Sequence, residues 1–351
     1  MQRKIIHLDC DCFFAAVEIR DNPEWGAVPL AVGGSSQRRG VIATCNYVAR
    51  EYGIHSAMPT AKALQLCPQL TVIPGHMEKY RQASAQIMSI YRDYTEVIEP
   101  LSLDEAYLDV TESMFCRGSA TLMAEEIRAR VKAEVGITVS AGVAPCKFLA
   151  KIASDWNKPD GLFLIRPSEV QAFVETLAVK KLFGVGEKTA ARLHQHGLMT
   201  CGDLKKVPLP QLVKAFGRFG QCLYELCRGI DERPVRVSRV RKSISVENTF
   251  SSDLPDLESC LHQLPGLLDN LETRFEKYHG KYSIKGAVVK LKFLDFTQTT
   301  AEHATEQLSP VFFERLLCEA YERGAKPVRL MGVGYRLGPV KLQQGEQLRL
   351  I

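Results

Sequence analysis

Two short apolar segments that carry acidic residues constrain the fold of this chain more than any other feature. IIHLDCD covers residues 5–11, and LSLDEAYLDV covers residues 101–110. Each has the length and the apolar content of a β-strand. Carboxylates embedded in apolar strands are costly to bury unless a positive charge neutralises them. The two segments therefore predict a sheet that holds its acids against a bound cation.

Asp9, Asp104 and Glu105 suit a pair of divalent cations. Hard cations such as Mg²⁺ bind carboxylate oxygens and borrow further ligands from substrate phosphates. Two such ions roughly 3.5 to 4 Å apart can activate an attacking hydroxyl and stabilise a leaving oxygen. Neighbours on a regular strand point to opposite faces, so we predict a turn or bulge at Asp104 and Glu105. The residues alone leave open an alternative in which Asp9 and Glu105 are strand-end acids in solvent or in ion pairs.

The composition is that of a folded protein with more than one domain. The 351 residues are 46% hydrophobic and 24% charged, and the net charge of +5 permits a polyanionic partner. Nothing resembles a signal peptide, and no stretch approaches the roughly 18 apolar residues of a membrane span. The eleven cysteines lack the paired spacing of a zinc site. We therefore expect a cytoplasmic protein with reduced, mostly buried thiols and no membrane association.

The order of apolar runs and turns predicts an α+β multidomain chain. Strands at 4–9, 101–110 and 137–143, with a helix at 119–134, would form a sheet covered on one face. A helical region follows, then a basic segment, and then a second α+β region. These three span residues 168–229, 228–242 and 243–351, and the last has strands at 285–293 and 328–337 and helices at 257–278 and 310–323.

Several longer motifs resemble the Y-family DNA polymerases, and most closely their bacterial DNA polymerase IV branch. They run over nearly the whole chain in the order of the family. The matching segments are IIHLDCDCFFAAVE (5–18), VIATCNYVAREYGIHSAMP (41–59), EPLSLDEAYLDVT (99–111), SAGVAPCKFLAKIASDWNKPDG (140–161), FGVGEKTAARL (183–193) and RKSISVENTF (241–250). A lone D-x-D motif would be weak, whereas this ordered set is specific.

The resemblance implies the right-hand polymerase fold. It predicts a ferredoxin-like palm, small fingers, an all-α helix-hairpin-helix thumb and an α+β little finger. The implied domains are palm 1–10 and 77–166, fingers 11–76, thumb 167–230, basic tether 231–242, and little finger 243–351 with a clamp-binding-like tail.

The resemblance also implies roles for individual residues around the acids. Asp9, Asp104 and Glu105 match the catalytic carboxylates that bind two Mg²⁺ ions, together with the backbone carbonyl of Cys10. Phe14 matches the steric gate that excludes a ribose 2′-hydroxyl. The implied nucleotide-binding set is Cys12, Phe13, Phe14, Thr44, Tyr47, Arg50, Tyr80 and Lys158. Without the resemblance, Phe13 and Phe14 would be assigned to the hydrophobic core, and Arg50 and Lys158 would be assigned to the surface.

Further residues match positions that bind DNA and the sliding clamp. Gly184, Gly186 and Lys188 resemble a helix-hairpin-helix turn, which receives a DNA phosphate at a helix N-terminus. A plain glycine turn is the alternative. Arg241 and Lys242 belong to the basic tether. The tail residues Gln347, Leu348 and Leu350 resemble a clamp-binding peptide, with an unstructured tail as the alternative.

The function implied is template-directed, low-fidelity DNA synthesis in translesion repair. Deoxynucleotides would be added to a primer 3′-hydroxyl on primer-template DNA, without proofreading, by a monomer tethered to the clamp. Two alternatives are kept open by the residues alone. One is a nucleotidyl transferase without template control, and the other is a non-catalytic DNA-binding scaffold, which would have no need of the three acids.

Overall fold

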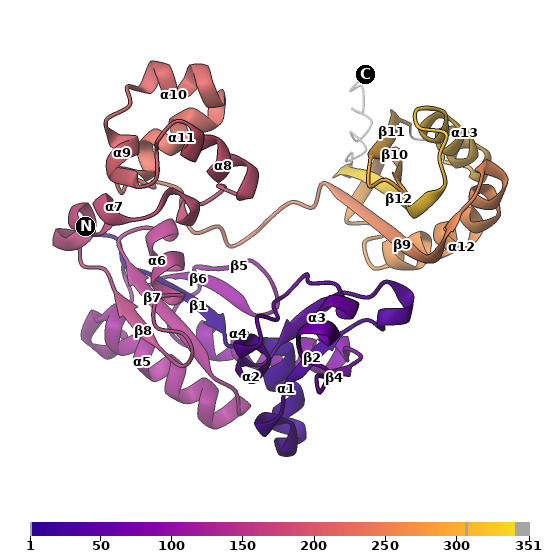
Figure 1. The fold of residues 1–351 in the computed structure, drawn as a ribbon. Coiled ribbons are helices and arrows are strands. Elements are labelled where there is room, and N and C mark those ends of the chain that lie inside the picture. Colours follow the sequence, from indigo (N-terminus) through magenta and orange to yellow (C-terminus); the bar gives the residue numbers. More distant parts are fainter. Residues whose placement is uncertain (1, 306–307, 341–351) are drawn as a thin grey trace, which may run out of the picture. The chain divides into compact units, whose positions relative to one another are not determined.

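The computed structural model describes residues 2–305 and 308–340. The chain divides into two compact units (Figure 1). The first contains Met1–Gly34 and Val41–Ser238, and the second contains Ser35–Gly40 and the residues from Arg239 onward. Each unit buries hydrophobic cores of its own.

The first unit is built around a mixed sheet in which the acid-bearing strand is central. The strand order is β5 (Ile98–Pro100), β6 (Glu105–Asp109), β1 (Ile5–Cys10), β7 (Val139–Ala144) and β8 (Leu162–Leu164). β1 runs antiparallel to both β6 and β7. Both neighbours therefore bring side chains to the end of β1.

The predicted irregularity at Asp104 and Glu105 is confirmed. The strand expected from 101 to 110 begins only at Glu105, so the predicted length was wrong. The chain bends just before it, because the backbone N–H groups of Leu101 and Ser102 both donate to the carbonyl of Glu105. The Asp104 carbonyl still accepts a hydrogen bond from the Cys10 N–H at 2.9 Å. The side chains of Asp104 and Glu105 are therefore not forced to point to opposite faces of the sheet.

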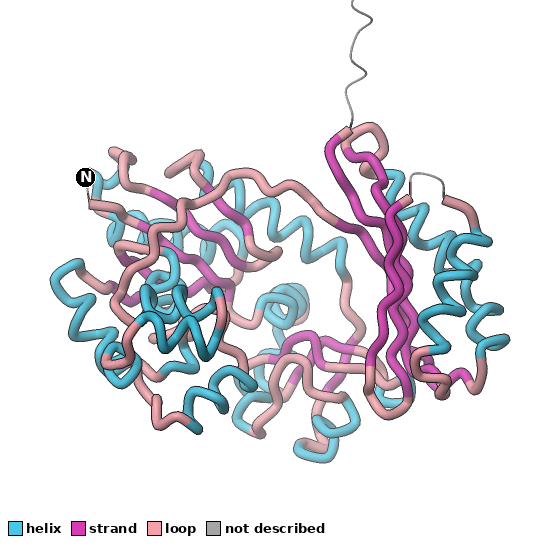
Figure 2. The backbone as a smooth tube through the Cα atoms, turned by 90° about the horizontal axis from the view of Figure 1, so that it is seen from above, coloured by secondary structure: helices cyan, strands magenta, loops and turns pink. Residues whose placement is uncertain are grey.

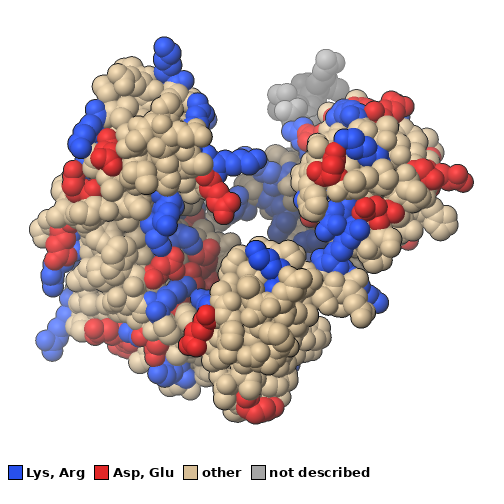
Figure 3. Space-filling view, viewed as in Figure 1, with Lys and Arg blue, Asp and Glu red and all other residues tan. Residues whose placement is uncertain are grey.

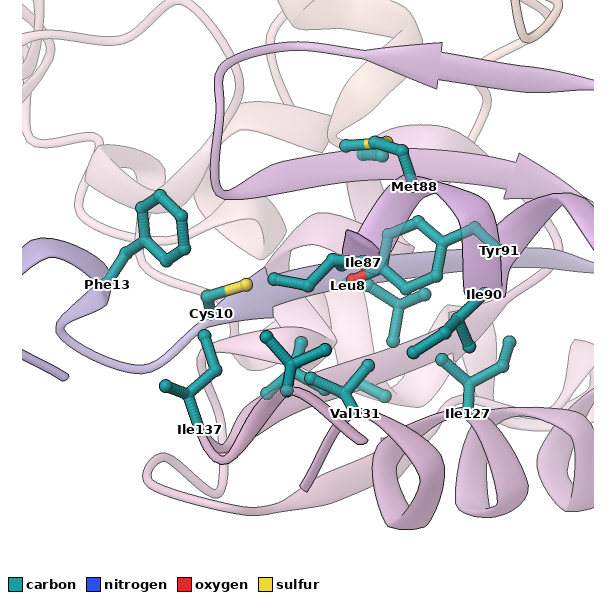
Figure 4. Close-up of a cluster of buried hydrophobic side chains, with 14 of the residues drawn as sticks. Leu8, Cys10, Phe13, Ile87, Met88, Ile90, Tyr91, Ile127, Val131 and Ile137 are labelled. Atoms are coloured by element: carbon teal, nitrogen blue, oxygen red, sulfur yellow. The ribbon is translucent and has the colours of Figure 1, made fainter. Parts of the chain in front are cut away.

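Helices cover both faces of this sheet, which corrects the expectation of one covered face. Leu8 and Cys10 pack on one face against α4 (Met77–Arg92) and α5 (Ala120–Arg130), as Figure 4 shows. Helix α6 (Lys147–Ser154) packs on the other face, against β1 and β7. Gly142 permits this close approach, since a Cβ there would lie 2.0 Å from the carbonyl oxygen of Ala150.

The predicted fingers region forms a small sheet with short helices. Helix α1 (Phe13–Asp21) leads from β1 into it. Asn46 organises this region, because its side chain accepts from the N–H groups of Leu30 and Ala49 and donates to the carbonyl of Val28. The remaining elements are β2 (Leu30–Gly33), β3 (Ile42–Cys45), α2 (Tyr47–Glu51), α3 (Thr60–Leu66) and β4 (Thr71–Ile73), with the strands in the order β3-β2-β4.

The predicted thumb region is helical, as its pattern indicated. Gly217 has φ +58° and separates the last two helices, and Gly220 lets them cross closely, because a Cβ there would lie 2.2 Å from the Leu212 carbonyl oxygen. The helices are α7 (Val170–Thr176), α8 (Glu187–Gln195), α9 (Cys201–Lys205), α10 (Leu209–Phe216) and α11 (Arg218–Leu226). Their core is continuous with the side chains of α6.

The first residues of the predicted tether 231–242 are anchored to the first unit. The Asp231 side chain, which is 2% exposed, accepts a hydrogen bond from the Phe148 N–H at 3.0 Å. Glu99 accepts from the Arg236 N–H at 2.7 Å and pairs with the buried Lys147. Val235 is buried as well. Basic composition predicted a linker, but these residues pack on the sheet domain because they meet partners far away in the sequence.

We expect Asp231→Asn to lower the free energy of unfolding by about 2 kcal/mol at pH 7. The Asp231 side chain is 2% exposed and pairs with Arg233 at 2.7 Å. Burial by itself would raise the pKa of Asp231, but the hydrogen bonds and charge of Arg233 lower it. A carboxylate with a depressed folded-state pKa stabilises the fold above its unfolded-state pKa of about 4 and loses that contribution at lower pH.

Urea unfolding of both proteins, at pH 7 and at pH values below 4, measures this effect. The difference between the two proteins should shrink in acid as Asp231 becomes protonated. Asp93→Asn is the matched control, because Asp93 pairs with Arg130 at 2.8 Å on an exposed surface. That variant should cost less than about 1 kcal/mol. The prediction would be contradicted if both variants lost the same free energy of unfolding. It would also be contradicted if the loss for Asp231→Asn did not change with pH.

The second unit is a sheet with two helices on one face (Figure 2). The antiparallel strands lie in the order β11 (Gln298–Ala304), β10 (Tyr282–Phe293), β12 (Val328–Pro339) and β9 (Ser243–Leu254). Helices α12 (Leu257–Glu276) and α13 (Pro310–Glu322) bury their apolar sides against it. Both predicted strands and both predicted helices are confirmed. Within the described ranges, no helix has both the length and the apolar character needed to cross a bilayer.

Candidate active site

Six of the eight predicted nucleotide-binding residues meet at one cavity at the end of β1. Its volume is about 160 Å³, and it is lined by Asp9, Cys10, Cys12, Phe13, Phe14, Ala43, Thr44, Arg50, Ser56, Asp104 and Lys158. A larger cavity of about 870 Å³, lined by residues such as Tyr94 and Phe115, contains none of the predicted site residues. The smaller cavity combines two carboxylates with two cations, and it is therefore the candidate active site.

The turn between β1 and α1 shapes this cavity. Cys12 has φ +41°, a left-handed conformation that is uncommon outside glycine. Buried Asp11 holds the turn, because it accepts hydrogen bonds of 2.8 Å from the hydroxyls of Thr138 and Ser140 and from the Asp160 N–H. Asp11 is therefore committed to structure, although it stands in the same acidic motif as Asp9.

Asp9 faces the cavity and carries a perturbed carboxyl group. It lies opposite Glu105 in the register of β1 and β6. Burial raises the pKa of Asp9 to about 6, even though its ion pair with Lys158 opposes the shift. One lysine therefore leaves the buried charge only partly compensated, and a bound cation would favour the ionised form.

Glu105 does not line the cavity and instead contacts His7 and Lys151. Its carboxylate lies 3.2 Å from Nε2 of buried His7 and forms an ion pair with Lys151 of α6. Burial would raise the pKa of Glu105, but these hydrogen bonds and the Lys151 charge lower it to about 2. Ligand atoms of His7, Asp9 and Glu105 all lie within 4.8 Å of one another. Glu105 is thus beside Asp9 without lining the cavity.

One wall of the cavity is aromatic. Phe14 stacks on Tyr80 of α4, with ring centroids 4.3 Å apart and an interplanar angle of 14°. Phe13 is buried and lies tilted against both rings. Tyr80 is fully buried, so it supports the wall from behind and does not line the cavity.

The fingers region supplies polar and basic groups to the same cavity. Thr44 lines the cavity from β3, and Arg50 lines it from α2. The guanidinium of Arg50 lies over the ring of Tyr47, 4.6 Å from its centroid. Tyr47 does not line the cavity, and its hydroxyl donates to Asp11 at 3.3 Å. Hydroxyls and cations arranged in this way suit phosphate oxygens.

Comparisons with known proteins identify the family of this chain. Three family models match: the impB/mucB/samB family at residues 8–155, the DNA polymerase-iota thumb domain at 180–231, and the impB/mucB/samB family C-terminal domain at 241–347. A DNA polymerase IV of Pseudomonas syringae pv. tomato is 55% identical and covers 99% of both chains. The chain belongs to the DNA polymerase IV family. It is thus a Y-family translesion DNA polymerase, as its motifs predicted.

Another DNA polymerase IV relative and two solved Y-family structures also match this chain. The enzyme of Ralstonia nicotianae is 56% identical and aligns with 95% of this chain and 94% of its own. A Y-family DNA polymerase chimera of Dbh and Dpo4 superposes with a TM-score of 0.86 at 31% identity, covering 95% of this chain and 98% of the other. An insertion ternary complex of Dbh DNA polymerase has a TM-score of 0.68 with the same identity and coverage.

The predicted DNA-binding residues of this polymerase lie outside the cavity. Gly184 has φ +84°, Gly186 is the N-cap of α8, and Lys188 lies in the first turn of that helix. Arg241 and Lys242 precede β9 in the second unit. The predicted clamp-binding residues Gln347, Leu348 and Leu350 lie outside the described residues.

Sequence reasoning missed some residues of the polymerase site. Ala43 and Ser56 line the cavity, and Lys151 pairs with Glu105. One signal was available for Lys151, because Lys147 and Lys151 are four residues apart in the KFLAKIAS motif and a helix places both on one face.

The donor set fits a divalent cation. Family membership implies metal-dependent catalysis, and the cavity offers carboxylate oxygens from Asp9 and Asp104. Oxygen donors of this kind suit Mg²⁺, which also keeps open positions for substrate phosphates. The raised pKa of Asp9 is consistent with a site whose negative charge is completed by a cation.

Proposed function

We propose that this polymerase adds deoxynucleotides to a primer 3′-hydroxyl under the direction of a template base, with two Mg²⁺ ions held by Asp9, Asp104, Glu105 and the carbonyl of Cys10. The supporting observation is that Asp9 and Asp104 share one cavity with Thr44, Arg50 and Lys158. Carboxylates that can bind cations therefore lie in the same cavity as groups that can donate to phosphate oxygens. When bound, the cations supply electrostatic stabilisation of the in-line displacement at the α-phosphorus.

The chain's own residues position the nucleotide in this proposal. Arg50 and Thr44 hold the triphosphate from the fingers, with Tyr47 fixing Arg50 from beneath. Lys158, which pairs with Asp9 at the cavity, would bind the triphosphate through its ammonium group. Glu105, which lies beside Asp9 and pairs with Lys151, would offer the cations a further carboxylate oxygen. Catalysis would thus consist of positioning and fixed electrostatics.

Phe14 acts as the steric gate in this proposal. The ring lines the cavity beside Cys12, and its stacking on buried Tyr80 limits its freedom to move aside. An extra ribose hydroxyl would have to occupy the space of the ring. Cys12 and Phe13 complete this side of the nucleotide site.

We further propose that fidelity is low, that proofreading is absent, and that the protein works in the cytoplasm as a monomer bound to the sliding clamp. The predicted fingers of 11–76 offer little surface for checking a new base pair. The clamp contact would use the C-terminal tail.

A template-swap assay tests the proposed function. Four primer-template duplexes that differ only in the templating base are each offered the four deoxynucleotides singly with Mg²⁺. The preferred nucleotide should follow the Watson–Crick partner of the template base. If the preferred nucleotide were the same on all four duplexes, the result would instead support a nucleotidyl transferase without template control.

We expect DNA binding to weaken with salt, and Arg241→Gln with Lys242→Gln to reduce that dependence. Basic side chains gather along the segment that joins the two units (Figure 3). Each lost phosphate contact should lower the slope of log affinity against log salt by about 0.9, hence by roughly 2 for the pair. Titration of a fluorescent duplex at several salt concentrations measures the slope.

The matched control for this prediction is Arg323→Gln with Lys326→Gln. These cations follow α13 in the same unit and are already paired with Glu319 and Asp295. The control should retain the slope of the unaltered protein. An unchanged slope in the Arg241 and Lys242 variant would remove these two residues from the proposed DNA contacts.

A further inference from the structure

A buried carboxylate lies directly behind the aromatic wall of the active site. Glu18 is 1% exposed, and its Oε1 accepts hydrogen bonds of 2.7 Å from the Tyr80 hydroxyl and from Nδ1 of His76. Lys79 lies 3.5 Å from the other oxygen. Burial opposes the ionisation of Glu18, but the bonds from His76 and Tyr80 and the Lys79 charge lower its pKa. The group is therefore an ionised acceptor at neutral pH.

Glu18 and Phe14 hold the same tyrosine from one helix. They are four residues apart on α1, so both lie on the side that faces α4. Glu18 binds the hydroxyl of Tyr80, and Phe14 stacks on the face of its ring. Phe13 lies 6.3 Å from the ring on another side. Tyr80 is fully buried, and its one polar atom is bonded.

This arrangement bears on how firmly Phe14 can exclude a larger sugar. Exclusion by steric contact depends on how far the excluding side chain can retreat, because repulsion falls steeply with small displacements. Phe14 cannot move toward Tyr80 unless Tyr80 also moves, and the hydroxyl of Tyr80 is held by its bond to Glu18. Without that acceptor, a buried hydroxyl would be left unpaired, and the ring would shift toward a new partner.

We propose that Glu18 is a positioning residue for sugar discrimination, which acts by fixing Tyr80 as a rigid support behind Phe14. The inference rests on the proposed role of Phe14 as the steric gate. It assigns a function in substrate selection to a carboxylate that does not line the active-site cavity. An ordinary structural role, joining α1 to α4, would affect stability and overall activity without changing the choice of sugar.

The test compares the ratio of kcat/KM for a deoxynucleotide and its ribonucleotide on one template. Glu18→Ala should lower this ratio about five- to tenfold through a higher ribonucleotide kcat/KM, since the hydrogen bond that holds the Tyr80 hydroxyl is lost. Its deoxynucleotide kcat/KM should stay within about twofold of that of the unaltered protein. Glu18→Gln keeps an oxygen acceptor for the Tyr80 hydroxyl and should restore the ratio.

Glu126→Ala is the matched control for loss of a tyrosine–carboxylate bond. Glu126 accepts from the Tyr94 hydroxyl at 2.7 Å in the same unit, away from the active-site cavity. This variant should leave the ratio unchanged. If Glu18→Ala does not fold, Tyr80→Phe carries the test, because it removes the same bond and should lower the ratio by a similar factor.

The outcomes separate this inference from the steric-gate proposal. If Phe14→Ala lowers the ratio but Glu18→Ala and Tyr80→Phe do not, the role of Glu18 is disproved and the gate stands. If Phe14→Ala leaves the ratio unchanged, the gate itself fails. A lowered ratio in the Glu126→Ala control would show that general loosening of the fold explains the effect, and it would also overturn the role of Glu18.

Discussion

Asp104→Asn should reduce primer extension by at least about a thousandfold, the largest loss expected from a single substitution in this protein. The change removes one negative charge and one ligand oxygen from the cavity and leaves the size of the side chain almost the same. Asp104 sits at the bend before β6, outside the sheet interior, and its carbonyl rather than its carboxylate supports the backbone pairing with Cys10. The fold should therefore survive.

Single-nucleotide extension under single-turnover conditions measures this loss, and a gel-shift titration measures DNA binding. Binding should be retained, which would place the defect in chemistry. Glu112→Gln is the control, because Glu112 is an exposed acid that lines the separate cavity of about 870 Å³. Near-normal extension by Asp104→Asn would contradict the assignment of this acid to the metal site.

Phe14→Ala should raise ribonucleotide incorporation about a hundredfold relative to deoxynucleotide incorporation. The substitution removes the ring from a cavity of only about 160 Å³, so it frees space where the 2′-hydroxyl would clash. Tyr80 should remain buried beneath the site, held by Glu18. The gain should therefore appear mainly in the ribonucleotide kcat/KM.

The control for Phe14→Ala is Phe115→Ala. Phe115 is 56% exposed and lies at the other cavity, so its loss removes an aromatic ring without changing the active site. That variant should keep the discrimination of the unaltered protein. If Phe14→Ala rejects ribonucleotides as strongly as before, sugar selection must reside in other residues of the cavity.

Local pattern alone predicted much of this architecture. Apolar runs and turn residues predicted the acid-bearing strand at 4–9, which forms at Ile5–Cys10, the helical region after 168, and two strands and both helices of the second unit. The irregularity at Asp104 was predicted because a regular strand cannot point two adjacent acidic side chains in one direction. The acids themselves were found through the cost of burying carboxylates in an apolar strand.

The same reasoning was wrong or silent wherever distant segments meet. The expectation of one covered sheet face failed because α6 approaches Gly142 so closely. The tether was taken from its basic composition, whereas Asp231 binds the Phe148 N–H, 83 residues away. No role was predicted for Glu18, because its partner Tyr80 lies 62 residues further along the chain.

The sequence by itself determined several of the strands and helices and the chemical kinds of residue in the site, because spacing and turn preference act over a few residues. Only the tertiary structure decided which of these residues meet. It pairs Asp9 with Lys158, turns Glu105 toward His7 and Lys151, and sets Tyr80 behind Phe14. Such contacts depend on strand register and helix packing, which join segments that no local pattern relates.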